Sequence, residues 1–288
     1  MRLHFRTKSI NYISYFLKRI AVKYLVSTGK KRGIHLAVFS NDTIGSNITI
    51  FGKYEENQLK AIDLFMEANC PEAFNGVALD IGANIGNHSL HFSERFSHVM
   101  AYEPNPITYK LLEANTMTVN NIETFNIALS DKSGTAMMTY SNENMGGATL
   151  LAQGTSPNTK TITARVSTLD KTITDTSNIS MIKIDVEGLE NNVLLGGKEF
   201  FDSGARPVIL FEQNKDQIDG RTSPTIETLR AMNYVFYTLE EKHLSSPSIT
   251  SRIWHSLPFN LRIDAYDFKY TDKFTPSNYS LIIALPRT

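Results

Sequence analysis

Cysteine is nearly absent from this sequence of 288 residues, and long apolar runs are absent altogether. A single cysteine, Cys70, excludes an internal disulfide framework and a zinc site built from several cysteines. No stretch approaches the ~20 consecutive apolar residues of a membrane-spanning helix. The composition, 41% hydrophobic and 20% charged, is that of an ordinary globular protein. The chain is therefore expected to bury its own core, as one large domain or a domain with an appendage.

Net charge is also absent, because 29 Lys and Arg residues balance 29 Asp and Glu residues. The balance is uneven along the chain. Residues 1–35 hold nine basic residues and no acid, whereas the remainder holds 20 basic and 29 acidic residues. A basic arm therefore precedes an acidic body. The acidic body argues against nucleic acid as a partner, since it would repel phosphate.

Residues 10–27 of the arm repeat apolar side chains at helical spacing, with Lys18, Arg19 and Lys23 between them. This periodicity predicts an amphipathic helix. Three interpretations stay open: the apolar stripe packs on the body, the basic helix lies on an anionic membrane or partner, or the segment is disordered. The expected location is cytoplasmic, or peripheral to a membrane through a weak contact of residues 1–35, since no secretory signal is visible.

Turn residues and apolar runs divide the chain into three parts. Residues 1–34 form the basic arm, and residues 35–75 are predicted to be two strands joined by a turn, followed by a helix. Over residues 76–288, short apolar strands alternate with helices, which predicts a mostly parallel sheet with helices on both faces. Two segments break the alternation: residues 131–170, predicted as a β-insertion, and the aromatic, loop-like residues 243–276.

The clearest chemical signal is residues 77–87, VALDIGANIGN, where a strand runs into a glycine-rich turn before a helix. The spacing is D-x-G-x-x-x-G, not the G-x-G-x-x-G of dinucleotide-binding proteins. Gly82 permits the tight turn, and Gly86 permits close packing of the helix on the sheet. Asp80 would repel a phosphate but suits an ammonium group. A ligand with both an ammonium and a carboxylate, such as the methionine part of S-adenosylmethionine, fits this turn.

A second signal lies 23 residues after Asp80, where the next predicted strand ends at Glu103. An acid there is placed to accept hydrogen bonds from both ribose hydroxyls. The alternative is that Asp80 and Glu103 are only cap and turn residues, but their spacing favours nucleoside binding. At the end of the third predicted strand, Ala128 is expected to contact adenine through its backbone. Asp131 is either a second adenine contact or a turn residue.

Further acids follow the later strands. Asp185 ends the fourth predicted strand, Glu187 follows in the turn, and Glu212 ends the fifth. Because the carboxyl ends of parallel strands meet at one edge of a sheet, these acids are expected to share a rim with Asp80 and Glu103. Carboxylates at such short distances from one another raise the pKa of at least one member of the group. A raised pKa suits a general base, and a cluster of acids also suits a metal ion. Asp185 is the first candidate for the base.

Two histidines, His88 and His91, lie one turn apart on the helix that follows the glycine-rich turn. His88 is a further candidate base, with a packed or solvated histidine as the alternative. A divalent ion held by the acids and one of these histidines is a second alternative. The prediction is for a site without metal.

Four segments, in this order and spacing, resemble the FkbM family of class I S-adenosylmethionine-dependent methyltransferases: VALDIGANIGNHSL, YEPNP, NIALSDKSG and IKIDVEGLE. The resemblance covers roughly residues 50–214, and residues 52–55, GKYE, are similar to a further family element. It implies a Rossmann-like sheet of seven strands, mostly parallel, with an antiparallel last strand. By position, the methionine part would be held by Asp80, Gly82, Asn84 and Gly86, and the ribose by Glu103.

The resemblance also implies O-methylation of a hydroxyl on a sugar, glycan or small natural product, with S-adenosylmethionine as cofactor. The catalytic candidates are Asp185, Glu187, Glu212 and His88. One alternative is a nicotinamide-dependent oxidoreductase, against which the glycine spacing argues. Another is a non-catalytic docking module, against which the complete rim of acids argues. Neither the basic arm nor residues 243–276 belong to the resemblance.

Overall fold

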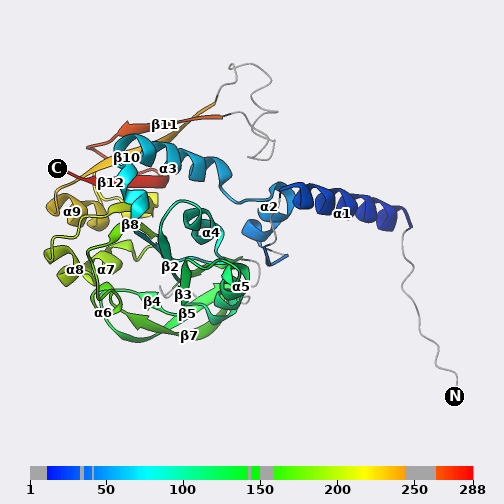
Figure 1. Ribbon diagram of the computed structural model, residues 1–288, viewed down its shortest axis with the longest axis horizontal. Helices are drawn as coiled ribbons and strands as arrows, with labels where there is room; N and C mark the ends of the chain where they lie inside the picture. Colours follow the sequence, from blue (N-terminus) through cyan, green and yellow to red (C-terminus); the bar gives the residue numbers. More distant parts are fainter. Residues whose placement is uncertain are drawn as a thin grey trace.

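The computed structural model describes residues 12–32, 36–40, 42–141, 144–149, 159–243 and 264–287. These residues form an α/β body from which one long helix projects (Figure 1). None of the helices within these ranges is long and apolar enough to cross a membrane.

An eight-stranded sheet runs through the body in the order β11-β10-β12-β9-β8-β1-β2-β3. Its parallel strands are β1 (Val77–Ile81), β2 (His98–Tyr102), β3 (Ile122–Phe125), β8 (Ile179–Ile184) and β9 (Val208–Gln213). The antiparallel pairings are made by β10 (Tyr234–His243), β11 (Asp264–Tyr270) and β12 (Tyr279–Pro286). The predicted fold class, with its antiparallel last strand, is confirmed, and the sheet has one strand more than the seven expected.

The additional strand, β11, lies inside the segment predicted to be loop-like, so that prediction is wrong for residues 264–270. Its aromatic residues have a packing role: the Phe268 ring lies 4.6 Å from that of Phe65. The strand pairs with β10 and forms the sheet edge. Trp254 and Phe259 lie outside the described residues.

Helices cover both faces of the sheet (Figure 1). Neighbouring residues of β1 show why: Leu79 joins one buried cluster with Phe200 and Leu229, whereas Ala78 joins another with Leu59. The body helices are α3 (Glu56–Asn69), α4 (Asn87–Ser93), α5 (Pro106–Thr116), α6 (Leu169–Thr172), α7 (Glu190–Leu195), α8 (Lys198–Asp202) and α9 (Pro224–Ala231). Two 3-10 turns, Pro71–Asn75 and Lys215–Gln217, complete the set.

A second, four-stranded sheet occupies the place of the predicted β-insertion, in the order β4-β7-β5-β6. Its strands are β4 (Ala128–Leu129), β5 (Gly134–Ser141), β6 (Asn144–Thr149) and β7 (Thr159–Ser167). The third predicted strand therefore splits: its first part is β3 of the main sheet, and its end is β4 of the second sheet.

The strand–turn–strand predicted between residues 35 and 52 is wrong. Residues 36–40 have no regular structure, and α2 (Thr43–Phe51) is a helix. Asp42, which lies where the sequence predicted a turn between the two strands, is its N-cap: Oδ1 accepts the backbone N–H of Ile44 at 2.9 Å. This cap, with burial of Ile48, outweighs the strand preference of the β-branched residues in the segment.

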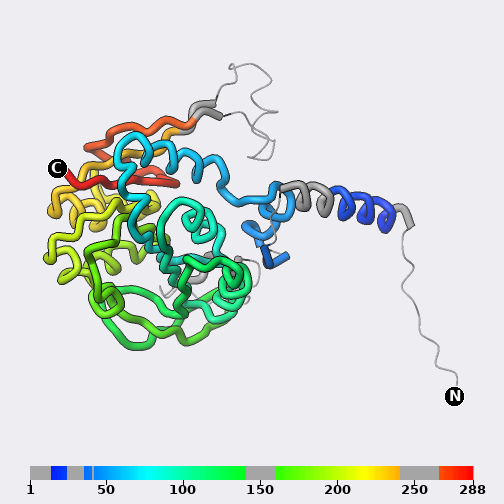
Figure 2. Tube along the Cα trace, viewed as in Figure 1, coloured from blue at the N-terminus to red at the C-terminus, as the bar shows by residue number. Residues whose placement is uncertain are grey.

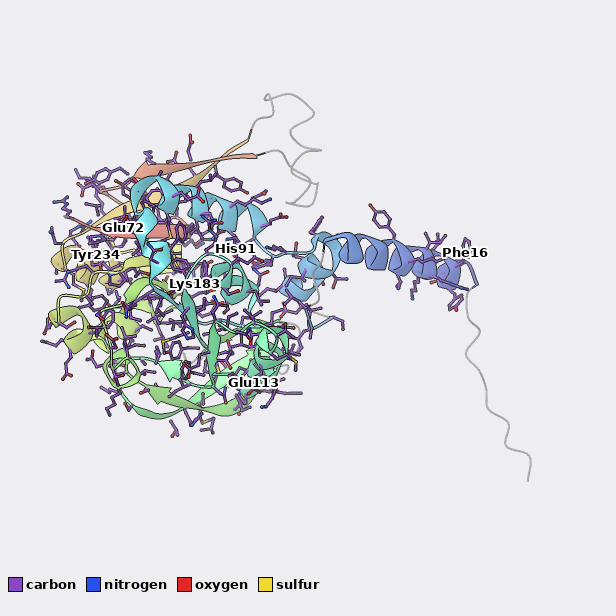
Figure 3. The ribbon with its side chains drawn as sticks, viewed as in Figure 1. Phe16, Glu72, His91, Glu113, Lys183 and Tyr234 are labelled. Atoms are coloured by element: carbon purple, nitrogen blue, oxygen red, sulfur yellow. The ribbon has the colours of Figure 1, made fainter. Side chains whose placement is uncertain are left out.

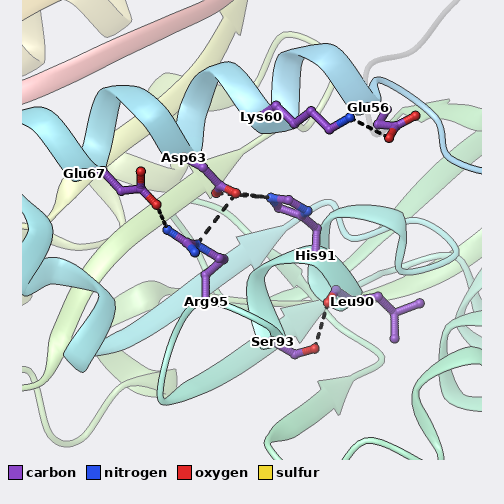
Figure 4. A network of polar contacts seen from close by, with 8 residues as sticks. All are labelled: Glu56, Lys60, Asp63, Glu67, Leu90, His91, Ser93 and Arg95. Carbon is purple, nitrogen blue, oxygen red and sulfur yellow. Dashed lines mark hydrogen bonds and ion pairs between the residues drawn. The ribbon is translucent and has the colours of Figure 1, made fainter.

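Ion pairs fasten α3 to α4 (Figure 4). The Asp63 carboxylate lies 3.1 Å from His91 Nε2 and 3.6 Å from Arg95 Nε, and Arg95 also pairs with Glu67. His91, considered above as a metal ligand, thus has a packing partner on a neighbouring helix.

The N-terminal helix α1 (Tyr12–Arg32) projects from the body and contacts α2 (Figure 2). The interpretation that its apolar stripe packs on the body is wrong, because every side chain from residue 15 to residue 24 is exposed. Phe16 marks this helix in Figure 3, well away from the sheet.

Candidate active site

A cavity of about 360 Å³ opens at the carboxyl ends of β1, β2, β8 and β9. This volume falls within the ~300–1,000 Å³ typical of small-molecule sites. Its walls include the turn after β1, the end of β2, the turn after β8 and the end of β9. Residues at the start of α2, and Tyr54 and Glu55 just before α3, also line it. The cavity lies at the sheet edge where the sequence predicted a ligand.

The glycine-rich turn is held by close backbone packing. Gly82 has φ +83°, and a Cβ there would lie 1.9 Å from the Asp185 carbonyl oxygen. Gly86 has φ +93°, and a Cβ would lie 2.9 Å from Leu112 Cδ1 on α5. Gly82 thus permits the predicted tight turn, whereas Gly86 makes room for a neighbouring helix rather than for the sheet.

Glu103 lies at the end of β2, as predicted, and its buried carboxylate lines the cavity. Oε2 accepts the backbone N–H of Asn84 at 3.0 Å, and Oε1 accepts that of Asn105 at 2.8 Å. Burial raises the pKa of Glu103 to about 7, although these two hydrogen bonds lower it. A contact of Glu103 with the ribose stays a prediction.

Asp80 is fully buried beneath the cavity and does not line it. Its Oδ1 lies 3.2 Å from Lys183 Nζ, and its Oδ2 accepts the Ser89 hydroxyl at 2.6 Å. A direct contact of Asp80 with a ligand ammonium stays a prediction, and its nearest ammonium here is that of Lys183.

Lys183, which is labelled in Figure 3, bridges two of the predicted acids. Its Nζ lies 3.3 Å from Asp185 Oδ2 as well as 3.2 Å from Asp80 Oδ1. Burial lowers the pKa of Lys183, but the charges of Asp80 and Asp185 outweigh it and leave the pKa raised. The sequence analysis missed this residue, although a lysine between isoleucines in a buried parallel strand was an available signal.

The remaining acids converge at the other end of the cavity, lined by Asp185, Glu187, Glu212 and Glu55. Burial, and then the charge of Asp185, raises the pKa of Glu212 to about 8 and that of Glu55 to about 7. The pKa of Glu187 is raised by the same two causes. Four of the five acids predicted to share a rim therefore line the cavity, Asp80 lies beneath it, and Glu55 joins them from outside the strand ends.

His88 also lines the cavity, with Nε2 3.4 Å from Glu55 Oε2. Burial, with help from the charge of Lys183, lowers the pKa of His88 to about 3. The imidazole is therefore neutral at pH 7 and a weak base. It lies in the site, as predicted, but its chemistry differs from that of a base with a pKa near neutrality.

At the adenine end, the structure separates the two predicted contacts. Ala128 lines the cavity together with Ile127 and Leu129. Asp131 does not line this cavity. Its carboxylate accepts the Asn192 side-chain amide at 3.0 Å and the Ser130 hydroxyl at 3.1 Å. These hydrogen bonds favour the alternative that Asp131 is a turn residue rather than an adenine contact.

Two asparagine amides attach the N-terminal wall of the cavity to the body. Asn87 accepts the Tyr54 N–H at 3.2 Å and donates to the Tyr54 carbonyl at 2.9 Å. Asn115 accepts the Ala37 N–H at 2.7 Å and donates to the Ala37 carbonyl at 3.0 Å. These attachments place Tyr54 and Glu55, within the family-like GKYE element, at the cavity.

The residues present fit a nucleoside with an amino-acid tail. Two buried polar atoms on cavity-lining residues, Asn84 Oδ1 and Tyr102 Oη, have no hydrogen-bond partner in the described part of the chain. Buried polar atoms are normally paired, so a polar ligand would complete them. Within the described ranges, no three His, Cys, Asp or Glu side chains are grouped to hold a metal ion.

Several solved structures resemble the chain, each at low identity. A precorrin-6y C5,15-methyltransferase from Geobacter metallireducens is 11% identical, with a TM-score of 0.43, over 88% of this chain and 100% of that one. An O-methyltransferase from Bacillus cereus, in complex with SAH, is 12% identical, with a TM-score of 0.36, over 92% and 90%. A putative O-methyltransferase from Klebsiella pneumoniae is 9% identical, with a TM-score of 0.42, over 96% of each chain. These similarities are too distant to bear on activity.

No curated protein matches the sequence. The family model described as "Methyltransferase FkbM domain" matches residues 80–236, more than half of the chain. The matched region begins at Asp80 and contains the glycine-rich turn, Glu103 and the acids that follow β8 and β9. The match favours a methyltransferase over a nicotinamide-dependent oxidoreductase. The chain belongs to the FkbM family of S-adenosylmethionine-dependent methyltransferases.

Proposed function

We propose that the protein transfers a methyl group to a hydroxyl oxygen of a sugar, glycan or small natural product. The observation that carries the proposal is the end of the cavity away from the adenine contacts, where Glu212 and Glu55 have pKa values of about 8 and about 7. A carboxylate with a pKa near neutrality suits removal of a proton from an alcohol.

Different residues along the cavity would hold the cofactor and activate the acceptor. The turn around Gly82 and Asn84, with Glu103, would hold the cofactor, and Ala128 would contact the adenine. S-adenosylmethionine supplies a methyl group already activated on a sulfonium, so alignment with the acceptor is the main task. An alcohol is a poor nucleophile, and a positioned base contributes typically ~10²–10⁴-fold.

We assign the role of the base to Glu212, whose pKa the charge of Asp185 helps to raise. Asp185 was the first candidate from the sequence, but its Oδ2 is held 3.3 Å from Lys183 Nζ. Its charge is a cause of the raised pKa of Glu212. In this proposal Glu212 accepts the hydroxyl proton, while Asp185 keeps Glu212 basic at neutral pH.

The test is methyl transfer from S-adenosylmethionine to a panel of neutral acceptors, including monosaccharides, oligosaccharides and hydroxylated natural products. Release of S-adenosylhomocysteine and the mass of the product report turnover. Transfer only to nitrogen or carbon would contradict the proposal. Tight cofactor binding without transfer to any acceptor would support the non-catalytic docking module.

A further inference from the structure

Helix α1 presents large apolar side chains to solvent over its whole described surface. Phe16 and Leu17 are 61% and 60% exposed, and Tyr15, Ile20 and Val22 are exposed to a similar degree. Contiguous exposed apolar surface of this kind marks an interaction site. The helix projects from the body, so the described part of the body does not cover it (Figure 2).

The exposed side chains are sorted around the helix. Phe16, Ile20 and Tyr24 lie along one side of the helix, because residues four positions apart are neighbours on its surface, and Leu17 lies next to them. Lys23, seven residues after Phe16, and Arg19 lie at one border of this side, and Lys18 lies toward its other border. The described part of α1 therefore has an apolar face with basic side chains beside it.

Charge decides which kind of partner fits this face. Residues 1–35 carry nine basic residues and no acid, whereas the rest of the chain is acidic. A second copy of α1 would bring like charges together, which opposes pairing of two such helices. A nucleic acid would use the basic side chains but would leave the apolar face unburied. An anionic bilayer surface satisfies both faces at once.

We propose that α1 docks the protein on a phospholipid bilayer rich in anionic lipid. Phe16, Leu17 and Ile20 enter the boundary between headgroups and acyl chains. The stems of Lys18, Arg19 and Lys23 lie along this boundary while their charged ends stay at the level of the phosphates. The inference rests on α1 alone and does not depend on the proposed acceptor or base.

The docked helix would be coupled to the cavity through fixed contacts. The chain that follows α1 is held at Ala37 by the Asn115 amide, and α2 then contributes Asp42, Thr43 and Ile44 to the cavity wall. Docking therefore places the N-terminal wall of the cavity on the membrane-facing side of the protein.

The test is sedimentation of the full chain with vesicles. One set contains phosphatidylcholine only, and the other contains phosphatidylcholine with phosphatidylglycerol. We expect binding to the anionic vesicles at least about tenfold stronger than to the neutral ones, and weakened by salt. Two triple variants, F16S/L17S/I20S and K18E/R19E/K23E, are each expected to lose about tenfold or more in this binding.

A matched control removes exposed apolar side chains elsewhere. The variant L64S/M117S/L195S changes three residues that are also exposed, on the body rather than on α1. It is expected to bind anionic vesicles as the unaltered chain does. Binding of S-adenosylhomocysteine, unchanged in all three variants, shows that the body is folded.

Three outcomes would overturn the proposal. The first is unchanged vesicle binding by either α1 variant, and the second is equal binding to neutral and anionic vesicles. The third is a dimer, seen by light scattering, that the F16S/L17S/I20S variant abolishes while no vesicle binding occurs. That result would assign the face to a second copy of the chain.

Discussion

The ionisation of Glu103 is expected to control cofactor affinity. Its pKa is raised to about 7 by burial, and only the carboxylate can accept hydrogen bonds from both ribose hydroxyls. Affinity for S-adenosylhomocysteine should therefore be full above pH 7 and fall by about tenfold for each pH unit below it. Calorimetry across this range measures the effect.

Two variants sharpen that prediction. Glu103→Gln should bind weakly and lose the pH dependence, whereas Glu94→Gln, an exposed glutamate at the end of α4, should retain it. Wild-type affinity in the Glu103→Gln variant would remove the ribose assignment.

The pH dependence of turnover should follow the ionisation of Glu212. Because the pKa of Glu212 is about 8, the rate should rise as pH approaches 8, and Glu212→Gln should lose about 10²-fold or more. Asp185→Asn removes a charge that raises this pKa, so the rising limb should move to lower pH while cofactor binding is retained. A pH–rate profile measures both. If the rising limb of the pH–rate profile stays at the same pH in Asp185→Asn, Asp185 does not set the pKa of the base.

Among the elements, the turn after β1 is the least tolerant of added atoms. Gly82→Ala would place a Cβ 1.9 Å from the Asp185 carbonyl oxygen, and φ is +83°. Gly204 provides a control, with φ +96° and nothing within 4 Å of an added Cβ. Gly204→Ala should cost roughly 1–2 kcal/mol from backbone strain alone. Gly82→Ala should cost clearly more and abolish cofactor binding.

Urea unfolding with binding of S-adenosylhomocysteine compares the two variants. Equal losses of unfolding free energy would mean that φ, rather than the contact between the turns after β1 and β8, makes glycine necessary at position 82.

The sequence allowed prediction of those site residues that stand at the ends of strands. Glu103, Asp185 and Glu212 were predictable because parallel strands end at one edge of a sheet. Two other features could not be predicted from the sequence. Glu55 reaches the cavity through a segment whose path depends on Asn87, a contact between residues 33 positions apart. Helix α2 was predicted as strand because a capping aspartate and a turn aspartate look alike in sequence.

At the scale of the whole molecule, the buried glutamates should make stability depend on pH. Glu55, Glu103 and Glu212 have folded-state pKa values of about 7, 7 and 8, above the ordinary 4.5. The folded state therefore binds more protons than the unfolded state, and stability falls as pH rises through 7 to 8. His88, with a pKa lowered to about 3 from 6.5, opposes this trend only below pH 6.5.

The free energy of unfolding without cofactor should thus be lower at pH 8 than at pH 6.5, by about 1–3 kcal/mol. Urea titrations at the two pH values measure the difference. The triple variant E55Q/E103Q/E212Q should show little change between them. Stability that does not fall with pH over this interval would mean that the three carboxyls are already ionised in the folded protein at pH 6.5.

The amides of Asn87 and Asn115 have a consequence for how this molecule can change over time. Each holds one residue of the preceding segment by its main-chain N–H and C=O, groups that all amino acids except proline share. The attachment is therefore indifferent to the side chains it carries. Mutations at positions 43 and 44, which line the cavity, leave these hydrogen bonds in place. The side chains of the cavity wall nearest the N-terminus can therefore be substituted without loss of its attachment to the body. New acceptor preferences can arise there while the cofactor site is unchanged.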